Sequence, residues 1–324
     1  MLELERPVVL APLAGGPSTP ELAAAVSEAG GLGFVAAGYL SADELAARVR
    51  RARTLTSGPV GVNLFVLAER PVDPAALAAY ADELAGEGPL GEPRFDDDAL
   101  DAKLELLVSE PVDVVSSTFG CFAPAAIERL RRAGSEVWVT VTSAAEARAA
   151  AEAGADALVC QGAEAGGHRG AWDDADGPDL PLAALLAEAR AAGLPLVAAG
   201  GVMDAAGAAA ALAAGAAAVQ CGTAFLLCPE AGTSAPQREA LARGGETAVT
   251  RAFTGRRARG IVNGFMRRHA AAPSAYPHVH HLTAPLRAAA RAAGDAERIN
   301  LWAGTGFAKA RALPAAEVVR ALSP

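Results

Sequence analysis

The chain has 324 residues, of which 52% are hydrophobic, with a net charge of −9 and four cysteines. That length and apolar content suffice for one large barrel or for two ordinary domains. The acidic balance argues against a nucleic-acid surface, which needs a clustered basic face. No signal peptide and no apolar run of about 18 residues is found, and the cysteines form no CxxC pair, so we expect no membrane span and a reducing cytoplasm.

Short apolar runs alternate with alanine-rich helical segments over the first two thirds of the chain. The strand-like runs are residues 8–12, 33–37, 60–65, 112–117, 137–141, 157–161, 196–200 and 217–222. The helical segments are residues 20–29, 41–54, 74–86 with 97–109, 123–133, 143–153, 182–192 and 204–214. Eight such units predict the α/β class and a TIM-like (β/α)8 barrel, because continuous apolar strands indicate burial on both faces.

The alternation is lost after the eighth strand-like run, which divides the chain into three parts. Residues 1–228 are expected to form the barrel, and residues 229–283 a smaller, mostly helical lobe. Residues 284–324 predict closing helices that pack back on the barrel. The alanine-rich helices would allow a homodimer, but nothing in the sequence decides that point.

Two glycine-rich loops follow the seventh and eighth strands. The seventh strand ends in Gly200 and Gly201, and the eighth in Gln220, Gly222 and Thr223. This pair of loops commonly binds phosphate in a (β/α)8 barrel, because glycine lets backbone N–H groups approach an anion. The alternative is that these glycines only form tight turns.

The loop after the first strand is small and apolar. Its residues Ala11, Pro12 and Leu13 would suit the face of a flat ring, although a simple strand–helix turn is the alternative.

Three side-chain amides lie in or at the ends of strands, at Asn63, Gln161 and Gln220. An amide both donates and accepts hydrogen bonds, so the three could bind the edge of a heterocycle. Each could instead serve the protein's own polar groups.

The stretch QGAEAGGHRG, residues 161–170, contains His168, the only histidine among the first 268 residues. Its ordinary pKa near neutrality makes His168 the candidate acid or base, with Glu164 as a possible partner for His168 or Arg169. The alternative is a flexible loop whose histidine is incidental. Six arginines between Arg251 and Arg268 predict either an anion site or a solvated face.

A second group of histidines, His278, His280 and His281, shares no spacing with a carboxylate or a cysteine. We therefore predict no metal site.

With these motifs, the chain resembles the nitronate monooxygenase family, the flavin enzymes formerly called 2-nitropropane dioxygenases. The resemblance runs almost end to end and is closest to the bacterial class I branch. It is carried by APLAGGPSTPELAAAVSEAGGLG (11–33), GVNLF (61–65), SSTFG (116–120), QGAEAGGHRG (161–170), AAGGVMD (198–204), VQCGTAFL (219–226), TGRRARG (254–260) and LWAGTG (301–306). One departure is Thr305, which replaces the glutamine of the family's WAGQG motif.

The resemblance implies FMN bound in the barrel and His168 in the active site. It places Asn63, Gln161 and Gly166 at the flavin ring, and Gly200, Gly201, Gln220, Gly222 and Thr223 at the ribityl chain and phosphate. The implied reaction is oxidation of an alkyl nitronate by O2 to a carbonyl compound and nitrite, through one-electron transfer to the flavin. His168 would act either as a protonated group that holds the nitronate or as a neutral base toward a nitroalkane.

Two other functions remain open from the sequence. The first is an FMN-dependent reductase that uses NAD(P)H, acting on enoyl-acyl-carrier protein or on quinone. The second is a barrel that binds a phosphate-bearing ligand without catalysis.

Overall fold

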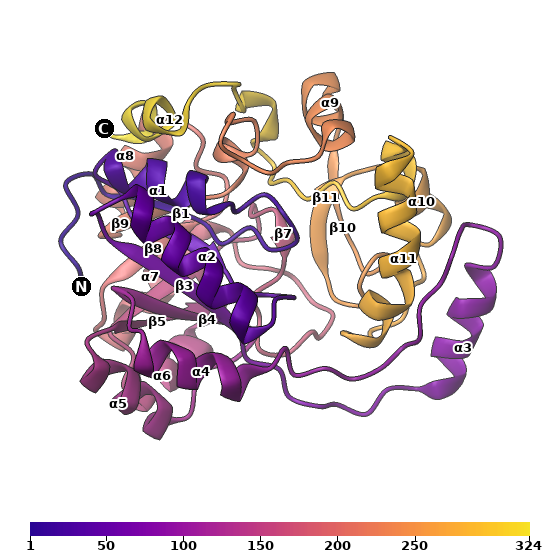
Figure 1. The fold of residues 1–324 in the computed structure, drawn as a ribbon, viewed down its shortest axis with the longest axis horizontal. Coiled ribbons are helices and arrows are strands. Elements are labelled where there is room, and N and C mark those ends of the chain that lie inside the picture. The colour runs from indigo at the N-terminus through magenta and orange to yellow at the C-terminus, as the bar shows by residue number, and fades with distance from the viewer.

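The computed structural model describes residues 1–324, and its larger part is a barrel of parallel strands surrounded by helices (Figure 1). Its strands are β1 (Val8–Leu10), β2 (Gly33–Ala36), β3 (Val60–Phe65), β4 (Val114–Thr118), β5 (Glu136–Val141), β6 (Ala157–Gln161), β8 (Leu196–Ala199) and β9 (Ala218–Cys221). All eight predicted strand-like runs are therefore strands of one sheet.

The strand order is β1-β9-β8-β6-β5-β4-β3-β2, and every neighbouring pair is parallel. Backbone hydrogen bonds join the two ends of this order. The N–H of Leu32 donates to the carbonyl of Val8 at 3.0 Å, and the N–H of Leu10 donates to the carbonyl of Leu32 at 2.9 Å. The predicted (β/α)8 barrel is confirmed.

Helices cover the outside of the barrel. They are α1 (Pro20–Glu28), α2 (Ala42–Leu55), α4 (Leu100–Ser109), α5 (Pro124–Ala133), α6 (Ala144–Ala153), α7 (Leu182–Ala189), α8 (Ala205–Ala213) and α12 (Ala315–Leu322). The chain also has four 3-10 turns, η1 (Arg190–Ala192), η2 (Thr223–Phe225), η3 (Ala296–Arg298) and η4 (Phe307–Lys309), of which η3 contacts helices of the smaller lobe. Local residues determine where α1 begins. Thr19 caps the helix by accepting a hydrogen bond from the N–H of Leu22 at 3.0 Å, and Pro20 occupies the first helical position.

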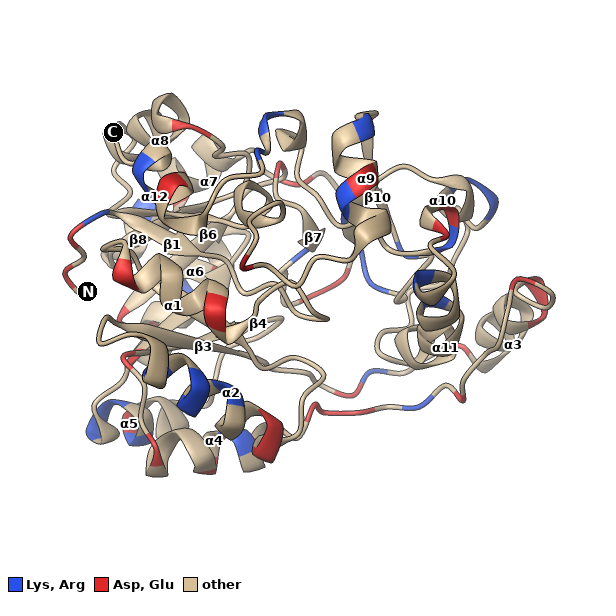
Figure 2. Cartoon of the chain, turned by 45° about the horizontal axis from the view of Figure 1, so that its top comes forward, with Lys and Arg blue, Asp and Glu red and all other residues tan.

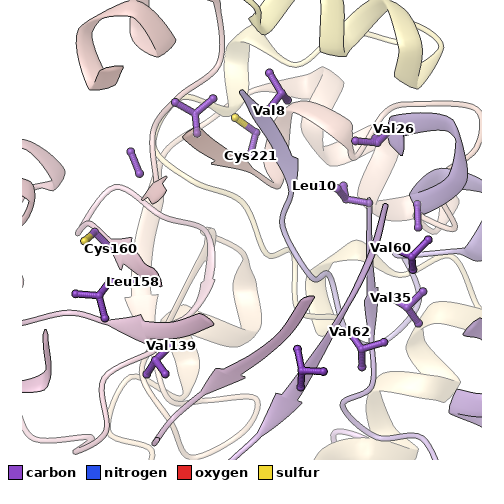
Figure 3. Close-up of a cluster of buried hydrophobic side chains, with 14 of the residues drawn as sticks. Val8, Leu10, Val26, Val35, Val60, Val62, Val139, Leu158, Cys160 and Cys221 are labelled. Atoms are coloured by element: carbon purple, nitrogen blue, oxygen red, sulfur yellow. The ribbon is translucent and has the colours of Figure 1, made fainter. Parts of the chain in front are cut away.

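Successive side chains of a barrel strand point in opposite directions and pack in two separate hydrophobic cores. Val8 and Leu10 point toward the helices and join the large outer cluster, part of which Figure 3 shows. Val9 points into the barrel, where it packs in a cluster with the fully buried Trp138. Because both faces are apolar, the strands read as continuous hydrophobic runs. Charged residues are found on the outer helices, such as α2 and α5, and also on helices of the smaller lobe (Figure 2).

The smaller lobe contains α9 (Ala235–Arg243), β10 (Thr247–Thr250), β11 (Ala258–Ile261), α10 (Gly264–Arg268) and α11 (His278–Ala292). It is mostly helical, as predicted, but β10 and β11 were not expected. They form an antiparallel sheet with the two-residue strand β7 (Gly167–His168), which comes from the stretch predicted to be a loop. The β-favouring run Thr247-Ala248-Val249-Thr250 was the signal for β10.

One helix expected on the barrel belongs to the lobe instead. Helix α3 (Pro74–Glu83) lies beyond α11 at the far side of the molecule (Figure 1). Tyr80 of α3 packs in a cluster with Phe253 and Phe265, and its hydroxyl donates to the carbonyl of Ala252 at 2.7 Å. Residues 74–86 therefore do not form a barrel helix, because their apolar face is buried in the lobe.

The division of the chain into residues 1–228, 229–283 and 284–324 stays a prediction. Helix α11 runs without a break across the expected boundary between Thr283 and Ala284. None of the helices combines the length and the apolar content that a membrane span requires.

Candidate functional site

A cavity of about 610 Å³ lies at the carboxyl ends of the barrel strands, where the lobe faces the barrel. Active sites of (β/α)8 barrels are found at this end of the strands. The cavity is lined by all twelve residues that the sequence singled out, which are Ala11, Pro12, Leu13, Asn63, Gln161, Gly166, His168, Gly200, Gly201, Gln220, Gly222 and Thr223.

The two glycine loops present unused backbone donors to this cavity. Gly200 and Gly201 have φ values of +116° and +74°, which a residue with a side chain rarely adopts. The N–H groups of Gly200, Gly201 and Gly222 donate to no acceptor in the protein. Three free N–H groups at adjacent strand ends are a suitable site for an anion, and the turn η2 begins directly after Gly222.

The side-chain amides differ in how far the protein satisfies them. Asn63 donates from Nδ2 to the hydroxyls of Ser116 at 2.9 Å and Thr118 at 3.0 Å, which leaves Oδ1 without a protein partner. The amide of Gln220 makes no hydrogen bond within the protein and lines the cavity. Both amides therefore retain groups that a ligand can bind.

Gln161 is committed to its own loop. Its Nε2 donates to the carbonyl of His168 at 3.0 Å, and its Oε1 accepts the N–H of Gly170 at 2.7 Å. Both ends of this amide hold the loop that carries His168. Gln161 therefore binds the protein's own polar groups, which was the alternative that the sequence left open. Its side chain also lines the cavity.

Gly166 lets the loop after β6 approach the C-terminal segment 301–306. A Cβ atom built on Gly166 would lie 2.4 Å from the carbonyl carbon of Ala303 and 2.4 Å from the nitrogen of Gly304. Gly304 in turn donates its N–H to Oγ1 of Thr223 at 3.0 Å. Thr305, the residue that departs from the family motif, is exposed and does not line the cavity.

His168 is presented by the small sheet of the lobe, opposite Ala258 of β11. Its Nε2 lies 2.9 Å from Oγ1 of Thr254, and its ring lies within 6 Å of three aromatic rings. Burial lowers the pKa of His168 to about 3, and the positive charges of Arg256 and Arg287 act in the same direction. The imidazole is therefore neutral near pH 7.

The expected partnership of Glu164 with His168 or Arg169 is wrong. Glu164 accepts the N–H of Leu182 at 3.0 Å, at the start of α7. Arg169 is buried and binds the carbonyl of Gly162 at 2.6 Å, with Asp179 at 3.3 Å as its counter-charge. Arg169 therefore fixes the loop rather than taking part in the cavity.

Half of the arginines between Arg251 and Arg268 are paired with carboxylates, two of them with an acidic loop that precedes α7 and Arg268 with Glu87. Arg251 binds Asp174 at 3.0 Å, and Arg257 binds Asp179 at 2.9 Å. Arg256 is buried, with its guanidinium 4.1 Å from the centre of the Phe119 ring. None of the arginines of this basic run lines the cavity, so the run does not contribute to the candidate site.

The sequence analysis missed the face of α11 that closes the cavity. Arg287 is buried and donates to Oγ1 of Thr283 at 3.1 Å and to the carbonyl of His280 at 3.0 Å. No carboxylate contacts it, and burial lowers its pKa to about 10. No aspartate or glutamate lines the cavity, whereas Arg287 and the exposed Arg291 both do.

A helical spacing was the signal that could have identified this face. His280, Ala284, Arg287 and Arg291 lie at i, i+4, i+7 and i+11, which places them along one side of a helix. His278 and His281 fall off this face and do not line the cavity. No three histidine, cysteine, aspartate or glutamate side chains come together in a group that could hold a metal ion.

Comparison with known proteins identifies the family of this chain. A sequence model of the family described as "Nitronate monooxygenase" matches residues 1–324. The chain belongs to the nitronate monooxygenase family. A nitronate monooxygenase from Pseudomonas aeruginosa is 43% identical to it over 345 residues, which cover 99% of this chain and 96% of the relative.

Solved structures share the fold of this chain. A nitroalkane oxidase from Streptomyces ansochromogenes is 50% identical, with a TM-score of 0.96 over 98% of this chain and 95% of that chain. FabK from Thermotoga maritima is 28% identical, with a TM-score of 0.77 over 99% of this chain and 92% of that chain. As a member of the nitronate monooxygenase family, this chain is an oxidoreductase, and it shares its fold with these relatives.

Proposed function

We propose that the chain binds FMN and uses O2 to oxidise alkyl nitronates to a carbonyl compound and nitrite. One observation carries the proposal: the cavity combines free backbone N–H groups at Gly200, Gly201 and Gly222 with an arginine wall and contains no carboxylate. Such a lining fits two anionic partners, a phosphate held by the glycine loops and a nitronate held near the arginines.

The residues present fit FMN. The cavity volume of about 610 Å³ is within the usual range for a cofactor pocket. The glycine loops and Thr223 would hold the phosphate, the free amides of Asn63 and Gln220 would bind polar edges, and Ala11 to Leu13 would provide a flat apolar wall. FMN, when bound, would supply the one-electron acceptor that oxidation of a nitronate requires.

The two roles considered for His168 are distinguished by charge. With a pKa lowered to about 3, His168 is neutral near pH 7, so it offers a lone pair to a proton but no positive charge to an anion. A nitronate formed beside the ring would raise this pKa, because an opposite charge favours the protonated imidazole. Arg287 is charged and buried, and no carboxylate contacts it. We therefore propose that Arg287 binds the negatively charged oxygens of the nitronate. His168 is then the base that converts a neutral nitroalkane into the nitronate.

The remaining partners follow from the same chemistry. We propose O2 and a small nitronate as the substrates and a cytoplasmic location, since all four cysteines are free thiols. A homodimer stays a prediction from the alanine-rich helices.

The NAD(P)H-dependent reductase that the sequence left open remains the alternative function. The discriminating experiment records the visible spectrum of the purified protein anaerobically, first with an alkyl nitronate and then with NADH. We expect bound FMN whose spectrum changes with the nitronate and is unaffected by NADH, and O2 uptake with nitrite release when air is admitted. Bleaching by NADH alone would establish the reductase instead, and protein that takes up no FMN would favour a non-catalytic barrel.

A pair of matched variants tests the role of His168. His168→Ala should lower kcat/KM for a neutral nitroalkane by about 10²-fold or more, as expected for loss of a general base. His278→Ala is the control, because His278 does not line the cavity. Unchanged turnover of the nitroalkane by His168→Ala would refute the assignment.

A further inference from the structure

The hydrogen bond between His168 and Thr254 joins the cavity to a buried backbone turn. Thr254 is only 1% exposed, and its Oγ1 lies 2.9 Å from Nε2 of His168. The other ring nitrogen, Nδ1, has no hydrogen-bond partner in the protein, and the His168 side chain lines the cavity. Which nitrogen carries the proton therefore decides whether the cavity faces a donor or a lone pair.

The surroundings of the Thr254 hydroxyl indicate the direction of this hydrogen bond. No backbone N–H donates to the carbonyl of Arg256, and Arg256 is itself buried. The hydroxyl of Thr254, 3.3 Å away, is the donor within reach of that carbonyl, and a buried carbonyl without a donor is costly. The N–H of Arg256 points back at Oγ1 from 3.4 Å, so the oxygen is also placed to accept.

We propose that Thr254 is a positioning residue that holds His168 in its Nε2–H tautomer, with the Nδ1 lone pair directed at the substrate. The Thr254 hydroxyl donates a hydrogen bond to the carbonyl of Arg256 and accepts one from the N–H at Nε2 of His168. This arrangement rests on the proposed function and deepens it, because only an unprotonated Nδ1 can remove a proton from a neutral nitroalkane.

The proton transfer balances without any further reactant. The α C–H bond of the nitroalkane breaks, its electron pair moves into the nitro group to form the nitronate, and the proton forms an N–H bond at Nδ1. The imidazolium produced is stabilised by the new anion beside it, and Arg287 holds the opposite charge of the nitronate oxygens. The proton then leaves to solvent before the next cycle.

Two variants of the FMN-loaded enzyme separate this role from a merely structural one. Thr254→Val keeps the shape of the side chain and removes the hydroxyl, whereas Thr254→Ser keeps the hydroxyl. We expect Thr254→Val to lower kcat/KM for neutral nitroethane about tenfold or more, and to leave preformed ethylnitronate within twofold of the parent. Thr254→Ser should behave as the parent with both substrates.

The tautomer itself is read by nitrogen NMR on protein with labelled histidine, and the His168 signals are assigned by their loss in His168→Gln. The parent and Thr254→Ser should show the Nε2–H form, and Thr254→Val a mixture of both forms. An Nδ1–H form in the parent would overturn the proposal, as would full nitroethane turnover by Thr254→Val. If His168→Gln also retained nitroethane turnover, His168 would not be the base. If the parent enzyme did not oxidise ethylnitronate, the proposed function would be refuted instead.

Discussion

The rings of Tyr39 and His280 stack face to face, with centroids 4.1 Å apart and planes 6° from parallel. Tyr39 follows β2 of the barrel, and His280 lies on α11 of the lobe. Both line the cavity, so this contact is the point where barrel and lobe meet at its wall. Tyr39 is held there in a left-handed conformation, with φ of +69°, by a hydrogen bond from its N–H to Oδ1 of Asp98 at 2.8 Å.

Removal of this stack should widen the cavity. We expect Tyr39→Ala to raise KM for a two-carbon nitronate several-fold, because the substrate loses an aromatic wall, and to relax the preference against longer alkyl chains. The measurement is kcat/KM across a series of alkyl nitronates. Tyr39→Phe keeps the ring and is the control, and an unchanged chain-length preference in Tyr39→Ala would contradict the prediction.

Arg291 should act on charged substrates before they bind. It is an exposed cation at the cavity that has no acidic partner. Arg291→Gln is expected to lower kcat/KM for an anionic nitronate a few-fold at low salt and to flatten its dependence on ionic strength. Neutral nitroalkanes should show no change. Arg291→Lys is the control, since it keeps the charge, and equal effects on both substrates would point to a structural role instead.

The stability of the protein should fall on mild acidification. Burial lowers the pKa of His168 to about 3 and that of His280 to about 2, whereas both residues have a pKa near 6.5 in the unfolded chain. Below pH 6.5 the unfolded chain binds more protons than the folded one. The free energy of unfolding therefore decreases as pH falls from 6.5 toward 3, by up to about 1.4 kcal/mol per pH unit for each histidine.

Urea unfolding at pH 7.5 and pH 5.5 measures the contribution of the histidines, which includes that of His278 and His281 because burial lowers their pKa values as well. The double variant His168→Gln/His280→Gln should lose less stability between the two values than the parent protein. An equal loss in both proteins would show that neither histidine is responsible.

Replacement of glycine by alanine should change the stability of the protein in opposite directions at Gly166 and Gly207. Gly166→Ala places a Cβ against the backbone of Ala303 and Gly304, which no side-chain rotation relieves, so we expect a loss of roughly 1–3 kcal/mol and weaker FMN binding. Gly207→Ala lies inside α8, where the nearest atom to the new Cβ is 3.4 Å away, and should stabilise the protein by up to about 1 kcal/mol. Thermal unfolding and FMN titration measure both, and a stable, FMN-binding Gly166→Ala protein would refute the close contact.

The barrel was predictable because its signals are local. Most strands are predominantly apolar runs, and several helices carry a side-chain cap or a terminal glycine, as at Thr19 and Gly154. The residues at the strand ends could be singled out for the same reason, since strand order alone places Gly200 and Gly222 together.

The lobe was harder to predict, because its structure depends on contacts between distant segments. Strand β7 has two residues and exists only through pairing with β11, about 90 positions later. Helix α3 carries no sign that its partners are Phe253 and Phe265 rather than the barrel. Arg287 appeared to be one charge among several on an alanine-rich helix, and its burial without a carboxylate is visible only once α11 is packed against the cavity.

The cavity wall is built from both ends of the chain, since it includes residues 11–17 and also Asn300, Trp302, Gly304 and Gly306. During synthesis on the ribosome, all eight barrel strands emerge before the last of these residues. A nascent chain or a truncated product that ends before residue 300 would contain all eight barrel strands but would lack α12 and part of the cavity wall. The FMN that we propose for this cavity would therefore meet its complete set of wall residues only when translation is nearly finished.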